Sequence, residues 1–177
     1  IFELKTERVE KLKPSDGIIA FIEENRERFY RVAFTYAKDE NDALDIVHNT
    51  IVKALQQYRT LKNREYLKTW FYRILINESI NFIKKRNRTV LFETVESNYV
   101  TENENESEKS DRYIDLYSAL DKLPSELKTV ILLRFFEDMK LTEISAVTSS
   151  NLSTTKSRLY KALEILKIGM EEADCDR

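Results

Sequence analysis

Residues 141–163 read LTEISAVTSSNLSTTKSRLYKAL, and this stretch decides the fold of the chain. A short helix is expected to begin here with Thr142 as its N-cap, and a polar turn follows at residues 149–150. Asn151 is a favourable N-cap for a second, longer helix. Two helices joined by a tight polar turn predict a helix-turn-helix. The apolar side chains expected to face inward are Ile144, Val147, Leu159, Ala162 and Leu163.

The outward side of the second helix carries hydroxyl, amine and aromatic groups near its N-terminus. In a helix-turn-helix this end meets base edges and phosphates in the major groove of DNA. Hydroxyls and amines donate to phosphates, and a tyrosine ring can pack on a thymine methyl. A helical hairpin with a merely solvated polar face is also common, so this segment alone leaves both interpretations open. The residues are Ser153, Thr154, Lys156, Ser157, Tyr160 and Lys161.

Helical periodicity extends over most of the remaining chain. Apolar residues recur at helical spacing over residues 18–36, 44–58 and 66–86, which predicts three helices with a core of their own. Acidic residues 39–42 favour the start of the second of these helices, and a polar loop at 59–65 precedes the third. Periodicity returns at Tyr113, and Leu123-Pro124-Ser125 starts another helix. The stripe expected to be buried on the second helix is Leu44, Val47, Ile51, Ala54, Leu55 and Tyr58.

Charge is gathered in blocks, although the formal net charge is only −2. Residues 53–88 carry ten basic and two acidic side chains, and residues 153–167 carry four basic and one acidic. Between them, residues 93–111 hold seven acids and one lysine without helical periodicity. Two basic stretches around an acidic one favour two surfaces for a polyanion and an extended connector. These patterns predict an all-α protein: two small helical domains joined by an acidic flexible linker, the C-terminal one a helix-turn-helix.

The composition excludes several classes of protein. Two glycines and two prolines in 177 residues are too few for a β-sandwich, a barrel, a doubly wound sheet or a Gly-rich phosphate loop. A single cysteine and a single histidine offer no disulfide, no zinc cluster and no nucleophile–base pair. We therefore expect no enzymatic activity, no cofactor, no metal and no small-molecule substrate. Residues 1–13 do not resemble a signal peptide, and no apolar stretch reaches the ~20 residues of a membrane span, so a cytoplasmic protein is expected.

Separate motifs in the two halves resemble those of the bacterial extracytoplasmic-function sigma factors, small two-domain subunits of transcription initiation. Residues 39–49, D-x-x-DA-x-DIVHN, resemble the acidic motif of the family's second conserved region. Residues 68–77, KTWFYRI-x-x-N, resemble its motif that melts and reads the −10 promoter element. Residues 123–159 resemble the fourth conserved region, with LP, LLR, EI and T-x-KSRL in family order. The resemblance covers most of the chain after residue 18.

Three positions depart from the family pattern. His48 stands where the family usually has Gln, and Asn49 stands where it has an acid. Residues 149–150 are both serine, whereas the family's turn usually contains Gly. A serine in the left-handed region costs about 1 kcal/mol, so we expect this turn to adopt another geometry.

The resemblance implies a division of the chain and three sets of contact residues. Residues 1–17 are an N-terminal extension, 18–89 the region 2 domain, 90–112 the acidic linker and 113–177 the region 4 domain. The residues implied to bind core RNA polymerase are Asp39, Asp42, Asp45, Ile46, His48 and Asn49. Those implied to bind −10 DNA are Arg59, Lys62, Asn63, Arg64, Lys68, Thr69, Trp70, Arg73, Asn77, Lys84 and Lys85. Those implied to bind −35 DNA are Ser153, Thr154, Lys156, Ser157, Arg158, Tyr160 and Lys161.

The resemblance also implies the partners. They are core RNA polymerase, bound through its β′ clamp and β flap, and promoter DNA. An anti-sigma factor is expected to hold the two domains and hide these surfaces, and such a factor in the membrane would keep the chain at its inner face. For Trp70, a core position and stacking on unpaired promoter bases both stay open.

Two other functions stay open. A helix-turn-helix repressor or activator with a helical sensor domain would bind duplex operators as a symmetric dimer, without polymerase. The segment 70–77 and the basic block before the linker argue against it. A helical adaptor that binds only protein would show no salt-dependent affinity for DNA. A nucleic-acid enzyme is disfavoured because the sequence offers no set of catalytic groups.

Overall fold

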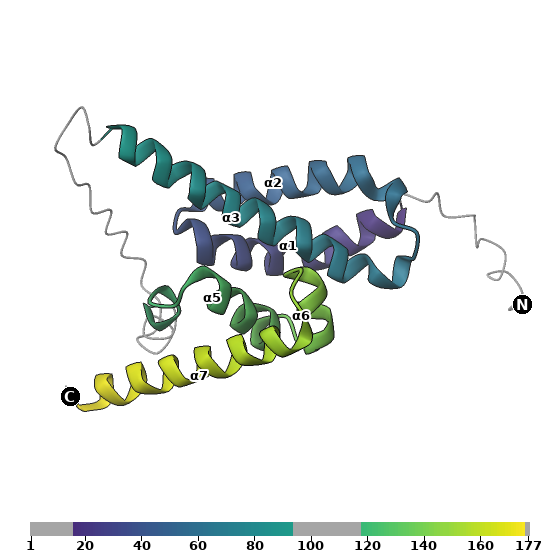
Figure 1. Ribbon diagram of the computed structural model, residues 1–177. Coiled ribbons are helices and arrows are strands. Elements are labelled where there is room, and N and C mark those ends of the chain that lie inside the picture. Colours follow the sequence, from purple (N-terminus) through teal and green to yellow (C-terminus); the bar gives the residue numbers. More distant parts are fainter. Residues whose placement is uncertain (1–15, 94–117, 176–177) are drawn as a thin grey trace, which may run out of the picture.

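The computed structural model describes residues 16–93 and 118–175, and every regular element within these ranges is helical (Figure 1). The predicted all-α class is therefore confirmed. The predicted N-terminal extension lies largely outside the described residues, as does most of the predicted linker. The first helical unit consists of α1 (Asp16–Ala37), α2 (Glu40–Gln57) and α3 (Leu67–Glu93). The second unit contains α5 (Ser125–Ile131), the π-helical turn η3 (Leu132–Phe136), α6 (Leu141–Val147) and α7 (Leu152–Cys175).

An aromatic core holds the first unit together. Phe29 of α1 stacks on Phe71 of α3 with ring centroids 4.3 Å apart, and Tyr72 meets Phe29 edge-on at 5.5 Å. Such pairs contribute about 0.5–1.5 kcal/mol beyond the apolar area that they bury. Leu75, one turn further along α3, is also fully buried. These contacts fix the rotation of α3, and with it the direction in which the 68–77 motif faces.

Helix α2 begins where the acidic residues predict. The Asp39 carboxylate accepts a hydrogen bond from the backbone N–H of Asp42 at 3.0 Å, which satisfies one of the unpaired donors of the first turn. Two residues of the predicted stripe are wrong, because Leu44 and Leu55 are 56% and 45% exposed. Helices α1 and α3 both pack against another face of α2, and this leaves the two leucines outside. The residues buried instead are Ala43, Ile46, Val47, Thr50 and Ala54.

The connection between α2 and α3 is ordered into two short 3₁₀ turns, η1 (Tyr58–Thr60) and η2 (Arg64–Tyr66). Asn63 caps η2, because its side-chain oxygen accepts from the backbone N–H of Glu65 at 3.0 Å. Helix α3 then continues to Glu93, past residue 90, where the sequence predicts the linker to begin.

The second unit has its own apolar core. Pro124 directly precedes α5, as predicted, and α5 widens at Leu132 into η3. Leu159 and Ala162 of α7 are buried as expected, but Leu163 is 38% exposed, so its predicted inward position is wrong. The remaining core is contributed mainly by aliphatic side chains, namely Leu120, Leu127, Val130, Leu133, Ile144 and Val147.

The cap and the turn of the helix-turn-helix both differ from expectation. The N-cap of α6 is Lys140 rather than Thr142, and the Lys140 backbone N–H donates to the Glu143 carboxylate at 2.7 Å. At the other end, Ser150 N–H donates to the Ser145 carbonyl at 3.0 Å, closing a Schellman motif. Ser149 occupies its left-handed position with φ 52°. The expectation of another turn geometry is therefore wrong: the serine adopts the conformation that glycine would adopt without strain.

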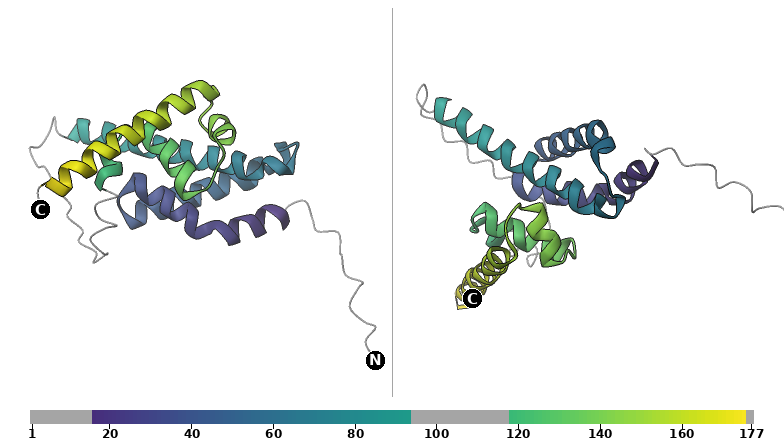
Figure 2. Two further views of the ribbon diagram at one scale, coloured as in Figure 1. Left: turned by 90° about the horizontal axis from the view of Figure 1, so that it is seen from below. Right: turned by 45° about the vertical axis from the view of Figure 1, so that its right-hand side comes forward.

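The two units pack against each other. Helix α6 lies against α3, and α5 lies close to α1 (Figures 1 and 2). A hydrogen bond of 2.7 Å joins the hydroxyl oxygens of Tyr36 in α1 and Thr129 in α5. None of the helices in the described ranges combines the length and the apolar character needed to cross a membrane.

The left-handed Ser149 gives a stability prediction. Ser149→Gly is expected to raise the free energy of unfolding by up to about 1 kcal/mol, because glycine carries no Cβ penalty at positive φ. Urea denaturation followed by circular dichroism measures this. Ser150→Gly is the matched control, and it is expected to destabilise because the Ser150 hydroxyl lies 2.7 Å from that of Thr148 and 3.0 Å from that of Thr155. Equal effects of the two changes would contradict the strain argument.

Candidate functional site

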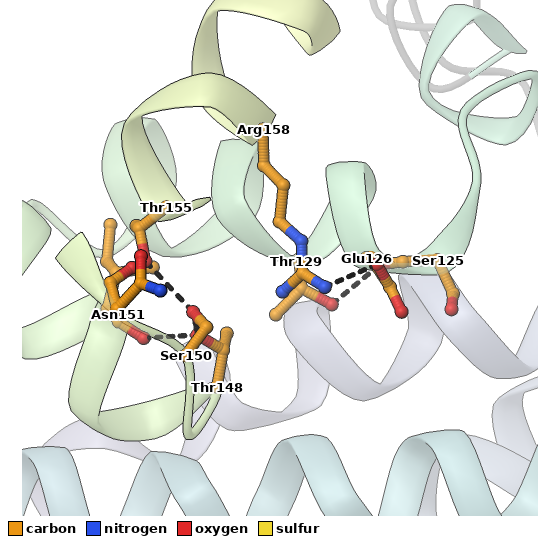
Figure 3. A network of polar contacts seen from close by, with 9 residues as sticks. Ser125, Glu126, Thr129, Thr148, Ser150, Asn151, Thr155 and Arg158 are labelled. Atoms are coloured by element: carbon orange, nitrogen blue, oxygen red, sulfur yellow. Dashed lines mark hydrogen bonds and ion pairs between the residues drawn. The ribbon is translucent and has the colours of Figure 1, made fainter. Parts of the chain in front are cut away.

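The N-terminal half of α7 presents a polar face to solvent. The helix begins at an Asn151 cap, whose side-chain oxygen accepts from the Thr154 backbone N–H at 2.7 Å. Thr155 is buried and joins a chain of hydroxyls through Ser150 to Thr148 (Figure 3). This network anchors the start of α7 to the end of α6. The exposed residues of the predicted set are Ser153, Lys156, Ser157, Tyr160 and Lys161, while Thr154 is half-buried.

Arg158 differs from the other predicted residues of α7. Its guanidinium donates to the Glu126 carboxylate at 2.5 Å, so α5 holds it to one side of the exposed face (Figure 3). An open groove lies here between α5 and α7. Ser153, Ser157 and Lys161 line one side of the groove, and Pro124 lines the other. Hydrogen-bond donors of α7 therefore lie beside the start of α5.

The outward face of α2 mixes apolar and polar groups. Asp45, His48 and Asn49 are exposed, and helical spacing places them on the same side as the exposed Leu44 and Leu55. Clusters of this kind are typical of surfaces that bind protein. The exposure of these two leucines was not predicted from the sequence, because their spacing also suits a buried stripe.

Three residues of the predicted polymerase-binding set have structural roles. Ile46 is 2% exposed and belongs to the core of the first unit, so its side chain is unavailable to a partner. Asp39 caps α2, and Asp42 lies 3.9 Å from Arg86 of α3. Arg86 also donates to the Ala37 carbonyl at 2.9 Å, which ties the end of α1 to α3.

The predicted −10 residues occupy the α2–α3 connection and the length of α3. Trp70 is half-buried and packs against the core, while part of its surface stays accessible. The structure therefore leaves room for both roles weighed for this ring. Thr69 is also half-buried, and Asn63 caps η2. The exposed residues of the set are Arg59, Lys62, Asn63, Arg64, Arg73, Asn77, Lys84 and Lys85.

Lys68 and Arg73 of the −10 set contact the second unit. The Lys68 ammonium donates to the backbone oxygen of Glu137 at 2.6 Å. The Arg73 guanidinium donates from Nε at 3.1 Å, and also from Nη2, to the carbonyl oxygen of Ala146. These contacts join α3 to Glu137, which precedes α6, and to Ala146 in the last turn of α6, and no sequence pattern predicted them.

Comparisons with known proteins agree with this arrangement. Residues 21–89 match the family Sigma-70 region 2, and residues 113–166 match Sigma-70, region 4. The chain is 40% identical over 159 residues to the RNA polymerase sigma factor SigV of Bacillus subtilis, covering 89% of this chain and 93% of the relative. It is 28% identical to the ECF RNA polymerase sigma-E factor of Haemophilus influenzae, covering 72% of this chain and 74% of that one.

Two solved structures share the fold. One is the sigma factor RpoE in complex with the anti-sigma factor NepR from Bartonella quintana, with a TM-score of 0.69 and 22% identity, covering 86% of this chain and 97% of that chain. The other is CnrH in complex with the cytosolic domain of CnrY, with a TM-score of 0.66 and 18% identity, covering 86% of each chain. The two region matches in order, the close relative over most of its length and the all-helical fold lead to one conclusion. The chain belongs to the extracytoplasmic-function family of RNA polymerase sigma factors.

Proposed function

We propose that the chain binds core RNA polymerase through residues 18–89 and directs it to promoters with −10 and −35 elements. Residues 113–177 bind the −35 element as duplex, and residues 90–112 link the two domains. The observation that carries this proposal is the pair of exposed faces, on α2 and on α7, in two units that match regions 2 and 4 in family order. No function is assigned to residues 1–17.

The outward face of α2 is the contact with the polymerase clamp. Exposed Leu44 and Leu55 supply apolar area, which gives most of the affinity of a protein interface. Asp45 beside them steers association with a basic partner and selects against acidic ones. Asp42 is a weaker candidate, because Arg86 already neutralises part of its charge.

Helix α3 and the connection between α2 and α3 bind the opened −10 element. Opened promoter DNA exposes unpaired bases of the non-template strand. Aromatic rings stack on such bases at about 1–3 kcal/mol each, and the accessible part of Trp70 suits this role. Lys62, Asn63 and Arg64 supply donors to a base held outside the stack. Binding free energy for the displaced strand, rather than covalent chemistry, drives the opening.

The exposed face of α7 reads the −35 element. Its lysines and hydroxyls lie near the helix N-terminus, where they can reach phosphates and base edges in the major groove. Arg158 belongs to the same predicted set, but its guanidinium is already paired with the Glu126 carboxylate. The β flap is the expected polymerase contact of this unit.

An anti-sigma factor is the expected regulator. The proteins RpoE and CnrH, whose fold the chain shares, are each described in complex with another protein, an anti-sigma factor in the case of RpoE. A partner of this kind would act in the cytoplasm, or at the inner face of the membrane if it is anchored there.

Run-off transcription tests the function. Core RNA polymerase is incubated with a genomic promoter library, with and without the full chain. Discrete transcripts that depend on the chain are expected. A silent polymerase combined with a shift of duplex DNA by the chain alone would favour a repressor or activator. Absence of any binding to core polymerase in a pull-down would contradict the sigma-factor function itself.

The α2 face gives a prediction for polymerase binding. Asp45→Lys is expected to weaken the affinity for core RNA polymerase at least tenfold, about 1.4 kcal/mol, because it reverses charge inside the contact. Biolayer interferometry with immobilised core polymerase measures the dissociation constant. Glu24→Lys makes the same charge change on the exposed side of α1 and is expected to bind normally. Equal loss in both variants would remove α2 from the interface.

The α7 face gives a prediction for the −35 element. Lys156→Ala/Lys161→Ala is expected to abolish the dependence of transcription on the −35 sequence, while binding to core polymerase stays unchanged. Loss of two phosphate contacts also lowers the slope of log affinity against log salt by about 2. Lys122→Ala, an exposed lysine of the same unit outside α7, is the control. An unchanged salt slope in the double variant argues against DNA contact by these lysines.

A further inference from the structure

An exposed aromatic ring lies just before α3, at a position outside the set of residues predicted to bind −10 DNA. Tyr66 is the last residue of η2, and it is 61% exposed. It is the most exposed large hydrophobic residue in the described part of the first unit. A single exposed tyrosine is ordinary on a protein surface, so the setting of the ring decides whether it has a role.

Hydrogen bonds fix the backbone that carries the Tyr66 ring. The Asn63 side-chain oxygen accepts from the Glu65 backbone N–H at 3.0 Å, and the Asn63 amide nitrogen donates to the Glu65 carboxylate at 3.1 Å. The Tyr66 backbone N–H donates to the Asn63 carbonyl at 3.3 Å, and that of Leu67 donates to the Arg64 carbonyl. A ring on a preorganised turn loses less conformational entropy on binding than a ring on a mobile loop.

Tyr66 lies one helical turn before Trp70. Leu67 has helical backbone angles, φ −55° and ψ −46°, so the spacing of α3 applies from Tyr66 onward. Residues four apart lie on the same face of a helix, with Cβ atoms about 5–6 Å apart. Asn77, two turns beyond Trp70, shares this face and is exposed. An exposed ring, the accessible part of a second ring and an amide therefore follow one line along α3.

The connection that carries Tyr66 is basic. Residues 58–66 contain Arg59, Lys62 and Arg64 against a single acid, Glu65, and all four are exposed. Lysine is depleted in the cores of protein–protein interfaces. Aromatic rings among cationic side chains are typical of surfaces that bind single-stranded nucleic acid, because the cations follow the backbone and the rings stack on bases. The charge around Tyr66 thus favours DNA over a protein partner.

We propose that Tyr66 stacks on an unpaired base of the opened −10 element, as a contact residue additional to the predicted set. The inference rests on the proposed function, which brings opened promoter DNA to α3. Successive bases of the non-template strand then meet the rings of Tyr66 and Trp70. Because a ring can stack in this way only on a base that has left the duplex, Tyr66 stabilises the opened promoter relative to the closed one.

Oligonucleotide binding by the holoenzyme tests the stacking. The full chain is combined with core polymerase, and fluorescence anisotropy measures the affinity for the single-stranded non-template −10 strand of a promoter mapped by run-off transcription. Tyr66→Leu keeps an apolar side chain without the aromatic face and is expected to weaken binding about tenfold. Tyr66→Phe keeps the ring and is expected to bind within about twofold of wild type. Wild-type affinity in Tyr66→Leu, or an equal loss in Tyr66→Phe, would overturn the inference.

A second exposed tyrosine provides the matched control. Tyr160 of α7 is 70% exposed and belongs to the set predicted for −35 DNA. Tyr160→Leu makes the same change of side chain in the second unit. Because the oligonucleotide carries only the −10 element, this variant is expected to bind it like wild type. An equal loss in Tyr66→Leu and Tyr160→Leu would overturn the assignment of Tyr66 to the −10 strand.

Abasic substitutions identify the base on which the ring stacks. Each position of the −10 oligonucleotide is replaced in turn by an abasic nucleotide, and wild type and Tyr66→Leu are compared on every substrate. At one position the difference between the two proteins is expected to disappear, because the ring no longer has a base to stack on. This comparison is a double-mutant cycle across the interface. An undiminished difference at every position would overturn base stacking.

Two further readouts separate failure of the inference from failure of the proposed function. Tyr66→Leu is expected to bind core polymerase like wild type, and a loss there with unchanged oligonucleotide binding would place Tyr66 in a protein interface and overturn the inference alone. A wild-type holoenzyme that yields no promoter-dependent transcript would remove the proposed function, and stacking on promoter DNA with it.

Discussion

Helix α3 packs against both helical units, and the rest of the structure depends on these two sets of contacts. Its inner face, with Phe71 and Leu75, completes the aromatic core of the first unit. An adjoining face, with Lys68 and Arg73, meets the second unit. Because the stacked aromatic pair fixes the rotation of α3, the position of both polar side chains is determined by the core. The same helix carries the motif that relates the first unit to region 2 of the sigma factors.

The two exposed faces lie on different helices and suit different kinds of partner. The face of α2 is partly apolar and suits a protein partner, whereas the face of α7 is polar and basic and suits DNA. Helix α3 meets the second unit of its own chain and also carries residues proposed to bind −10 DNA. The face of α2 is open to solvent in this structure, whereas Lys68 and Arg73 of α3 are engaged by the second unit.

Much of this fold could be predicted from the sequence, because helices with strong periodicity and good caps are locally determined. Asp39 and Asn151 cap their helices as expected, since capping depends only on neighbouring residues. Leu44 and Leu55 were misplaced because periodicity identifies an apolar stripe without saying which neighbour covers it. Arg73 was predicted to contact DNA, yet its partner here is a carbonyl 73 positions away in sequence. Contacts across that distance arise from the packing of whole units, which no local pattern encodes.

Photo-crosslinking from position 73 tests most directly whether α3 binds the −10 element as proposed. Arg73→p-benzoylphenylalanine is introduced into the full chain, and crosslinks are mapped in the free protein and in the open promoter complex with core polymerase. The account predicts a crosslink to the α6 segment of the same chain in the free protein, and a crosslink to the non-template strand of the −10 element in the open complex. The same intramolecular crosslink in both states, with none to DNA, would contradict it.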